Sequence, residues 1–269
     1  MENWSAHHVY SAAIDRRLSQ AAAQNLASYA HRLRTKSLPV IFTLAHLSQI
    51  TGVRFKTLHQ TVARRREAAN YRLHWIRKRS GGKRPIHTVS RELSRVHRFI
   101  NEEILQRVKP HPSSFAFHPS GGITSCARQH CGARWLFQYD IENFFFTINE
   151  IDVYWIFVGL GYSHLLSFEL ARLCTTIRLP YEVFDLPRRS HWNRTDHANV
   201  FYFYAHPILG VLPQGTATSP MLANLACIRL DHKLFETAES KGMVYTRYAD
   251  DSVPRALNVA SATGGARCT

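Results

Sequence analysis

Acidic residues are scarce in this sequence. Its 269 residues include 19 Asp and Glu against 34 Lys and Arg, which gives a formal net charge of +15 and a pI near 10.0. Such an excess of positive charge attracts polyanions, and nucleic acid is the polyanion that fits best. Because basic proteins need not bind nucleic acid, a positively charged surface without that partner remains the alternative.

Paired cysteine motifs are also missing. Five cysteines lie at positions 126, 131, 174, 227 and 268 without any CxxC spacing, and their odd number argues against a closed disulfide framework. We therefore expect a protein of the reducing cytoplasm. Cys126, His130 and Cys131 are close in sequence but lack the second half of a zinc site, so small buried thiols are the favoured interpretation.

We expect neither a secretion signal nor a membrane span. The first residues lack the charged and then apolar layout of a signal peptide. The apolar run at 153–168 is shorter than the ~20 residues that cross a bilayer, and it contains two glycines and a histidine. A buried helix and the absence of a membrane partner follow as expectations.

Helical spacing of apolar residues dominates the first part of the chain. It predicts a helix over residues 11–36, a helical pair over residues 44–62 that breaks at Gly52, and a helix over residues 90–108. The pair has the spacing of a helix-turn-helix, although simple packing is favoured over a reader of the DNA major groove.

Between these helices the charge balance becomes extreme. Residues 54–84 carry eleven Lys and Arg but a single acid, Glu67. Within this stretch, residues 75–86 form two short β-like runs that flank a Ser-Gly-Gly turn and carry basic residues on both arms. The pattern predicts a hairpin that reaches over an anion and that the following helix braces. A solvated basic face is the alternative.

Two stretches place acidic side chains at strand ends. Residues 135–140 form an apolar run that ends at Asp140, and residues 243–247 form a strand that leads into a Tyr-Ala-Asp-Asp turn at 248–251. Magnesium prefers oxygen ligands, so the adjacent Asp250 and Asp251 invite a third carboxylate. Asp140 is the candidate, although alone it is as consistent with a helix N-cap.

Three further segments bear on the site. Residues 123–130 are predicted to form a helix. Either its polar groups contact a nucleic-acid backbone, or it is an ordinary helix whose His130 is hydrogen-bonded. Residues 180–207 indicate an irregular connection to which we assign no role. A Pro-Gln-Gly turn at 213–215 precedes a helix that starts at Ser219-Pro220. Gln214 would lie against a nucleotide, since a capped helix explains the Pro and Gly but not the Gln.

Taken in order, these motifs resemble those of reverse transcriptases. The segments Tyr-Asp-Ile-x-x-Phe-Phe at 139–145, Pro-Gln-Gly-x-x-x-Ser-Pro at 213–220 and Tyr-Ala-Asp-Asp at 248–251 are similar to successive palm motifs of that family, and the hairpin resembles its fingers. The similarity covers residues 40–252 and is strongest to the bacterial retron and group II intron branch. That branch has an Asn-Ala-x-x-His helix before the first palm strand, where this chain has Cys126 in place of Asn.

The resemblance implies an α/β (α+β) right-hand polymerase with fingers, an antiparallel palm sheet and packed helices. It divides the chain into an N-terminal helical region (1–75), fingers (76–134), a palm (135–252) and an atypical tail (253–269). Pro254 cannot donate to a strand ladder, and the last fifteen residues lack apolar alternation. We therefore expect a compromised strand after Asp251 and no thumb.

The resemblance also implies an activity. We expect an RNA-directed DNA polymerase that adds deoxynucleotides to a primer 3′-hydroxyl by two-metal phosphoryl transfer, within a retron-like antiviral defence system. The implied partners are an RNA template, a DNA or RNA primer, deoxynucleoside triphosphates and a cognate structured non-coding RNA. The alternatives are a relative that extends without a template and a non-catalytic nucleic-acid-binding fragment.

The site residues that the resemblance implies form three overlapping groups. Catalysis is assigned to Asp140, Asp250 and Asp251. Two Mg²⁺ ions, or Mn²⁺ in their place, are assigned to Asp140, Ile141, Asp250 and Asp251. Nucleotide binding is assigned to Lys78, Lys83, Arg84, Phe145, Gln214 and Gly215, among which Phe145 excludes a ribose 2′-hydroxyl by its bulk.

Overall fold

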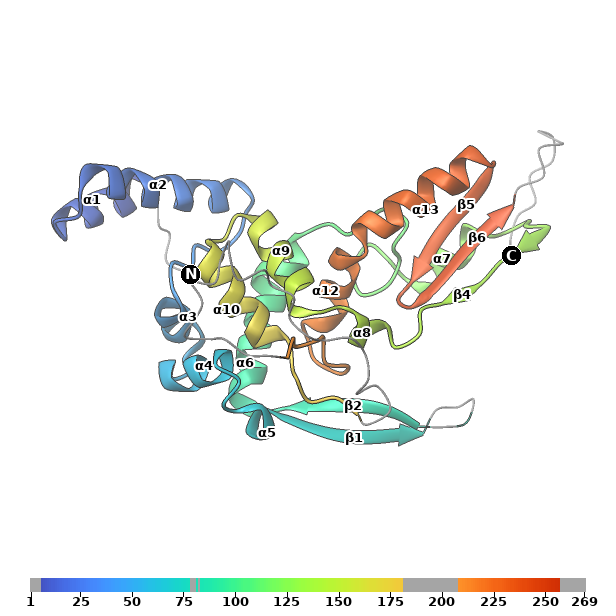
Figure 1. The fold of residues 1–269 in the computed structure, drawn as a ribbon. Coiled ribbons are helices and arrows are strands. Elements are labelled where there is room, and N and C mark those ends of the chain that lie inside the picture. The colour runs from blue at the N-terminus through green and yellow to red at the C-terminus, as the bar shows by residue number, and fades with distance from the viewer. Residues whose placement is uncertain (1–5, 78–80, 82, 181–207, 257–269) are drawn as a thin grey trace.

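The part of the chain that the structure describes combines a group of helices with two separate antiparallel sheets (Figure 1). The structure, a computed structural model, describes residues 6–77, 81, 83–180 and 208–256. In Figure 1 a two-stranded hairpin runs along the lower edge, and a small sheet lies at the opposite end from the first helices. This arrangement confirms the mixed α/β class.

The first helical stretch is two helices rather than the single one expected over residues 11–36. Helix α1 (Ala6–Asp15) ends before Arg17, whose φ of 60° leaves the right-handed helical region, and α2 (Gln20–Thr35) begins anew. Ser19 caps α2 because its Oγ accepts a hydrogen bond from the Ala22 N–H at 3.3 Å. Local capping chemistry therefore divides a run that apolar spacing alone left continuous.

The predicted helical pair is confirmed. Helix α3 (Leu44–Thr51) ends at Gly52, whose φ of 65° makes a left-handed C-cap, and α4 (Phe55–Val62) follows. Buried residues of the pair include Leu47, Leu58 and Val62. Packing therefore holds the pair in the main core.

The predicted basic hairpin is also confirmed. After the short helix α5 (Glu67–Asn70), strand β1 (Tyr71–Arg77) pairs antiparallel with β2 (Lys83–Val89). The register sets Arg77 opposite Lys83, so both arms carry positive charge next to the turn. Residues 78–80 and 82 of that turn lie outside the described residues.

The helix that follows the hairpin changes its winding along its length. It runs as α6 (Arg91–Phe99), then as the π-helical turn η1 (Ile100–Ile104), then as the 3₁₀ turn η2 (Leu105–Arg107). Its buried apolar residues are Leu93, Val96, Ile100, Ile104 and Leu105. The apolar spacing of residues 90–108 thus predicted the buried face but not the winding.

The apolar run at 153–168 falls in two helices, so the expectation of one buried helix was wrong. Helix α9 (Glu150–Leu160) ends at Gly161, which has a left-handed φ of 109°. Helix α10 (His164–Cys174) begins after Ser163, whose Oγ accepts from the Leu166 N–H at 3.4 Å. In the part of the chain that the structure describes, no helix has the length and apolar character needed to cross a membrane.

Four further helices flank the predicted motifs. Helices α7 (Ile123–Arg128) and α8 (Phe144–Thr147) lie before and after Asp140 in the chain. Helix α12 (Ser219–Ala226) starts at the predicted Ser-Pro and leads into α13 (Ile228–Ser240). The helix start predicted from that dipeptide is therefore confirmed.

The small sheet is built around one strand. Strand β6 (Asp251–Ala256) pairs along its whole length with β5 (Met243–Tyr248). On its other edge β6 pairs with β4 (Tyr139–Asp140) at one end and with β3 (Trp135–Leu136) at the other. A single strand therefore joins the two acidic motifs of the sequence.

Residues 135–140 form two short strands rather than the single buried strand expected. Trp135 is 64% exposed and Tyr139 is 62% exposed. Both lie in two-residue strands that only extend the outer edge of the sheet, where they bury little of their surface. The apolar composition of this run therefore did not predict its burial.

Pro254 does not prevent β6 from forming, so the expectation of a compromised strand was wrong. Pro254 pairs in register with Tyr245, and the two-residue turn before β6 makes this a pair without mutual backbone hydrogen bonds. The edge that the proline nitrogen faces is the one where β3 and β4 are interrupted, between the Leu136↔Arg255 and Tyr139↔Ser252 pairs. The sheet therefore loses no backbone hydrogen bond between paired residues because Pro254 lacks an N–H group.

A buried ion network ties the helices together. Glu150, at the start of α9, accepts from Arg172 Nε at 3.0 Å, from Arg64 Nη2 at 2.5 Å and from the Gly210 N–H at 3.0 Å. The side chains of Arg64, Glu150 and Arg172 are 0%, 4% and 4% exposed. Arg64 also pairs with Glu67 at 3.0 Å. Because all these charges are removed from water, the network is stable only while each partner is present.

Glu150→Gln should be strongly destabilising. The two buried arginines would lose the charge that they share, so we expect the free energy of unfolding to fall by about 3–5 kcal/mol. Glu103→Gln is the matched control, because the Glu103–Arg107 pair is partly exposed and such pairs contribute at most about 1 kcal/mol. Urea unfolding followed by circular dichroism measures both variants, and equal losses would contradict the importance of burial.

Candidate active site

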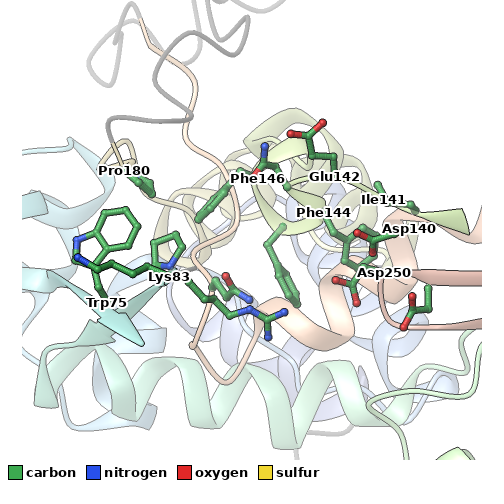
Figure 2. A pocket seen from close by; sticks show the side chains of 15 residues that line it. Trp75, Lys83, Asp140, Ile141, Glu142, Phe144, Phe146, Pro180 and Asp250 are labelled. Atoms are coloured by element: carbon green, nitrogen blue, oxygen red, sulfur yellow. The ribbon is translucent and has the colours of Figure 1, made fainter. Parts of the chain in front are cut away.

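A pocket lies between the basic hairpin and the small sheet (Figure 2). Its volume is about 1010 Å³. The lining residues come from the hairpin (Trp75, Lys83, Arg84 and Pro85), from residues 140–146, from Pro180 and Gln214, and from Asp250 and Asp251. Of the predicted site residues that the structure describes, all line this pocket except Gly215.

The two acidic motifs meet on one wall of the pocket. Strands β4 and β6 are antiparallel neighbours, and their register sets Asp140 directly opposite Asp251. Side chains in such a pair share one face, with Cβ atoms about 4.5–5.5 Å apart. The Ile141 N–H donates to the Asp250 carbonyl at 3.1 Å and so joins the end of β4 to the turn. Figure 2 shows Asp140 next to Asp250, with Ile141 beside them.

The charge on Asp250 is influenced by both neighbouring acids. Burial raises the pKa of its carboxyl group, and the charges of Asp140 and Asp251 raise it further, whereas Arg84 lowers it. The site therefore disfavours a third negative charge unless a cation is nearby. A divalent cation between the carboxylates would relieve this repulsion.

The donor set fits a hard divalent cation in its chemistry. Carboxylate oxygens are the side-chain ligands that Mg²⁺ prefers, and Gln138 Nε2 orients one of them by donating to Asp251 Oδ1 at 3.1 Å. Among residues 6–77, 81, 83–180 and 208–256, however, no group of three His, Cys, Asp or Glu side chains is arranged to hold a metal ion. The predicted metal ligands, Asp140, Ile141, Asp250 and Asp251, therefore stay a prediction.

The other wall of the pocket is basic and aromatic. Lys83 and Arg84 are exposed on β2, and Trp75 on β1 is 44% exposed. Figure 2 shows Trp75, Lys83 and Pro180 gathered at one side of the pocket. Acids on one wall and cations on the other suit a ligand whose phosphates bridge a metal ion to basic side chains. Lys78, the third predicted cation, lies outside the described residues.

The Pro-Gln-Gly turn is held against β2. The His87 N–H donates to the Gln214 carbonyl at 2.7 Å. Gly215 has a φ of 105°, and a Cβ atom there would lie 2.7 Å from Ile86 Cγ2. Gln214 lines the pocket, but Gly215 does not. The close backbone approach predicted for Gly215 is therefore an approach to β2 rather than to a nucleotide.

Phe145 is the most accessible of three consecutive phenylalanines. Phe144 and Phe146 are each 4% exposed, whereas Phe145 is only partly buried and lines the pocket. Its ring centroid lies 5.4 Å from that of Phe144 and 6.4 Å from that of Phe117. A ligand in the pocket could therefore contact Phe145 while the flanking rings stabilise its position.

The helix before the small sheet has an ordinary structural role. His130 Nε2 and Thr246 Oγ1 form a hydrogen bond of 2.6 Å, and Cys126 Sγ lies 3.4 Å from the same oxygen. These contacts join the segment at α7 to β5. They match the interpretations of His130 as hydrogen-bonded and of Cys126 as a small buried thiol.

Two polar residues that support the site were not predicted from the sequence. Arg247, on β5, is 0% exposed, and its Nη1 donates to the Ala249 carbonyl at 2.9 Å. A signal was available, because an arginine at the end of a mostly apolar strand needs a buried partner. Gln138, which orients Asp251, lies between two short strands and carries no comparable signal.

The chain is similar to several retron reverse transcriptases. It is 31% identical over 222 residues to the retron Ec86 reverse transcriptase of Escherichia coli, and the aligned residues cover 82% of this chain and 59% of that protein. It is 29% identical over 254 residues to the retron Mx65 reverse transcriptase of Myxococcus xanthus, and here the aligned residues cover 93% of this chain and 56% of that protein. The chain thus spans little more than half the length of these two relatives. No family model matches it.

Gly215→Ala should destabilise the protein more than Gly52→Ala. Both glycines have positive φ, but a methyl group at position 52 would meet no atom within 4 Å. Gly52→Ala therefore measures only the free-energy cost of placing a residue with a Cβ atom in a left-handed conformation, which is roughly 1–2 kcal/mol. Gly215→Ala adds an overlap with Ile86, which should cost a further ~1–3 kcal/mol. Urea unfolding of both variants tests this order, and a smaller loss at position 215 would contradict the contact with β2.

Proposed function

Because this chain is a relative of the bacterial retron reverse transcriptases, we propose that it forms the fingers and palm of an RNA-directed DNA polymerase. Residues 1–75 would be an N-terminal helical region, residues 76–134 the fingers and residues 135–252 the palm. The observation that supports this most is the meeting of two acidic motifs on one wall of a pocket whose other wall is basic. The enzyme would add deoxynucleotides to a DNA or RNA primer on an RNA template.

The acidic wall would hold the catalytic metal ions. Asp140 and Asp250 would bind two Mg²⁺ ions, or Mn²⁺ in their place, with Ile141 as a further ligand and Asp251 as support. Bound ions would activate the primer 3′-hydroxyl and neutralise the leaving pyrophosphate. The protein itself contributes position, because the β4–β6 register sets two carboxylates opposite each other and the Ile141–Asp250 hydrogen bond fixes the turn beside them.

The basic wall would bind the incoming nucleotide. Lys83 and Arg84, with Lys78 as a third cation, would contact the triphosphate. The charge of Arg84 already acts on Asp250, which supports a position for the phosphates between the two walls. Gln214 would contact the nucleotide from the turn that lies against β2, and Phe145 would lie beneath its sugar.

We also propose a partner and a setting of the retron type. A cognate structured non-coding RNA would bind the chain, in a cytoplasmic antiviral defence system. The net charge of +15 supports a polyanionic partner of this kind. Lys83 and Arg84 of the hairpin are exposed and line the pocket, so both are available to such a partner.

Primer extension tests the proposed activity. Purified protein, or a version extended to the length of its relatives, should incorporate deoxynucleotides on an RNA template with Mg²⁺. Asp250→Asn removes a ligand charge and should slow extension by about 100-fold or more. Asp15→Asn is the matched control, because Asp15 is an exposed acid at the end of α1 and should leave the rate unchanged.

The other outcomes of this assay identify the alternatives. Equal extension without a template would favour a template-independent relative. Binding of RNA without extension by either version would favour a non-catalytic fragment. Extension that survives Asp250→Asn would contradict the assignment of the acidic wall.

Phe145→Ala should weaken the selection of deoxynucleotides over ribonucleotides. If Phe145 lies beneath the sugar, its truncation removes the clash with a 2′-hydroxyl, and we expect the ratio of the two kcat/KM values to fall by about tenfold or more. Steady-state kinetics with both nucleotide types measures the ratio.

Phe157→Ala is the control for this substitution. The Phe157 ring, on α9, is fully buried and does not line the pocket, so its loss should lower the free energy of unfolding by about 3–5 kcal/mol without changing the choice of sugar. An unchanged ratio in Phe145→Ala, together with a similar loss of stability, would assign Phe145 to the core instead.

A further inference from the structure

Arg247 lies buried directly before the Tyr-Ala-Asp-Asp turn. Its side chain is 0% exposed and is among the largest of the fully buried side chains. Burial lowers the pKa of this guanidinium group, but the hydrogen bonds and charge of Asp231 outweigh that effect and raise it. The group is therefore a permanent positive charge inside the protein, and it requires a complete set of partners.

The five N–H donors of Arg247 are matched by five acceptors. Nε and Nη2 donate to the two carboxylate oxygens of Asp231 at 2.8 and 2.7 Å. Nη2 also donates to Ser114 Oγ at 3.4 Å. Nη1 donates to Asn224 Oδ1 at 3.2 Å and to the Ala249 carbonyl at 2.9 Å. Two parallel bonds to one carboxylate require the planar fork that arginine alone carries.

These acceptors fix Arg247 to several elements at once. Asp231 belongs to α13, Asn224 to α12, and Ser114 to the loop that precedes α7. Asp231 is itself held by the Tyr245 hydroxyl, which donates to Oδ1 at 2.9 Å. The guanidinium group is therefore oriented from three directions before it reaches the turn.

The backbone of Arg247 adds a further connection to the same loop. Its N–H donates to the Ser113 carbonyl at 2.8 Å, and its carbonyl accepts from the Phe115 N–H at 2.9 Å. The ring of Phe144 lies 5.8 Å from the guanidinium carbon. Arg247 thus contacts the segment that follows Asp140 as well as the strand that precedes Asp250.

The Ala249 carbonyl is the link between this network and the candidate site. Ala249 has a φ of 61°, a conformation that residues with a Cβ atom adopt only uncommonly. Its carbonyl belongs to the peptide unit that joins it to Asp250. A hydrogen bond from a fixed, charged donor therefore stabilises an unfavourable backbone at the point where the carboxylates begin.

We propose that Arg247, oriented by Asp231, is a positioning residue that fixes the turn carrying Asp250 and Asp251. It acts through the Ala249 carbonyl and does not touch the substrate. The catalytic consequence rests on the proposed polymerase function, whereas the structural consequence does not. The competing explanation is a buried ion pair that only stabilises the core, as the Glu150 network does.

Hydrogen exchange on the metal-free full chain tests the structural part. Arg247→Lys keeps the charge but loses the fork, so it cannot bind Asp231 through two bonds and still reach Ala249. Amides in a peptide over residues 243–251 should exchange about tenfold faster or more, measured by mass spectrometry below the melting temperature of every variant. A peptide over residues 71–89 should exchange at the wild-type rate.

Two further variants keep the test decisive. Arg247→Met combined with Asp231→Leu removes both buried charges together, which preserves folding better than removal of one, and its turn should also exchange faster. Arg172→Met is the matched control, because it removes a buried cation of the Glu150 network that contacts no residue of the turn. That variant should lose stability while exchange at 243–251 stays unchanged.

Primer extension tests the catalytic part. Arg247→Lys should lower kcat by about 100-fold, with the KM for nucleotide changed much less, because the carboxylates move while the basic wall does not. Wild-type exchange in the turn of both Arg247 variants, or equal acceleration in Arg172→Met, would overturn the positioning role. Absence of extension by both the wild-type chain and its extended version would overturn the proposed function instead, and the exchange rates would still decide the role of Arg247.

Discussion

Three carboxylates that repel one another are held together in one turn and one strand pair, and the surrounding structure depends on that constraint. Asp140 and Asp251 lie directly opposite each other, where like charges are unfavourable by up to about 1 kcal/mol, and Asp250 beside them has a raised pKa. A flexible chain would let these groups separate. The sheet prevents this, because at Asp251 strand β6 is paired on both of its edges.

The protein places positive charge at two depths around these acids. Arg247 is buried before the turn and has all its donors engaged, so it belongs to the fold and cannot bind a ligand. Arg84 is exposed on the opposite wall of the pocket and can exchange its partner. An exposed cation such as Arg84 can bind a phosphate group that enters the pocket and release it again. A buried cation with fixed partners, such as Arg247, can instead hold the backbone of the turn in place.

The sequence predicted the elements that depend on neighbouring residues. The break at Gly52, the hairpin of β1 and β2 and the helix start at Ser219 each follow from a few adjacent side chains. It did not predict how long apolar runs divide, because the runs at 135–140 and 153–168 have the same composition whether they continue or break. The tolerance of Pro254 depended on which neighbouring strand its nitrogen would face, and no local pattern encodes that.

The candidate site could be predicted in its carboxylates but not in what holds them. Arg247 reaches partners 16, 23 and 133 residues away in the sequence, so spacing could not identify them. A buried arginine must have hydrogen-bond acceptors, and this requirement can be predicted from physical chemistry. Which residues supply those acceptors cannot. The same burial explains the rigidity: a charged group with every donor engaged cannot move without leaving an unsatisfied partner, and a turn that carries repelling carboxylates requires such an anchor.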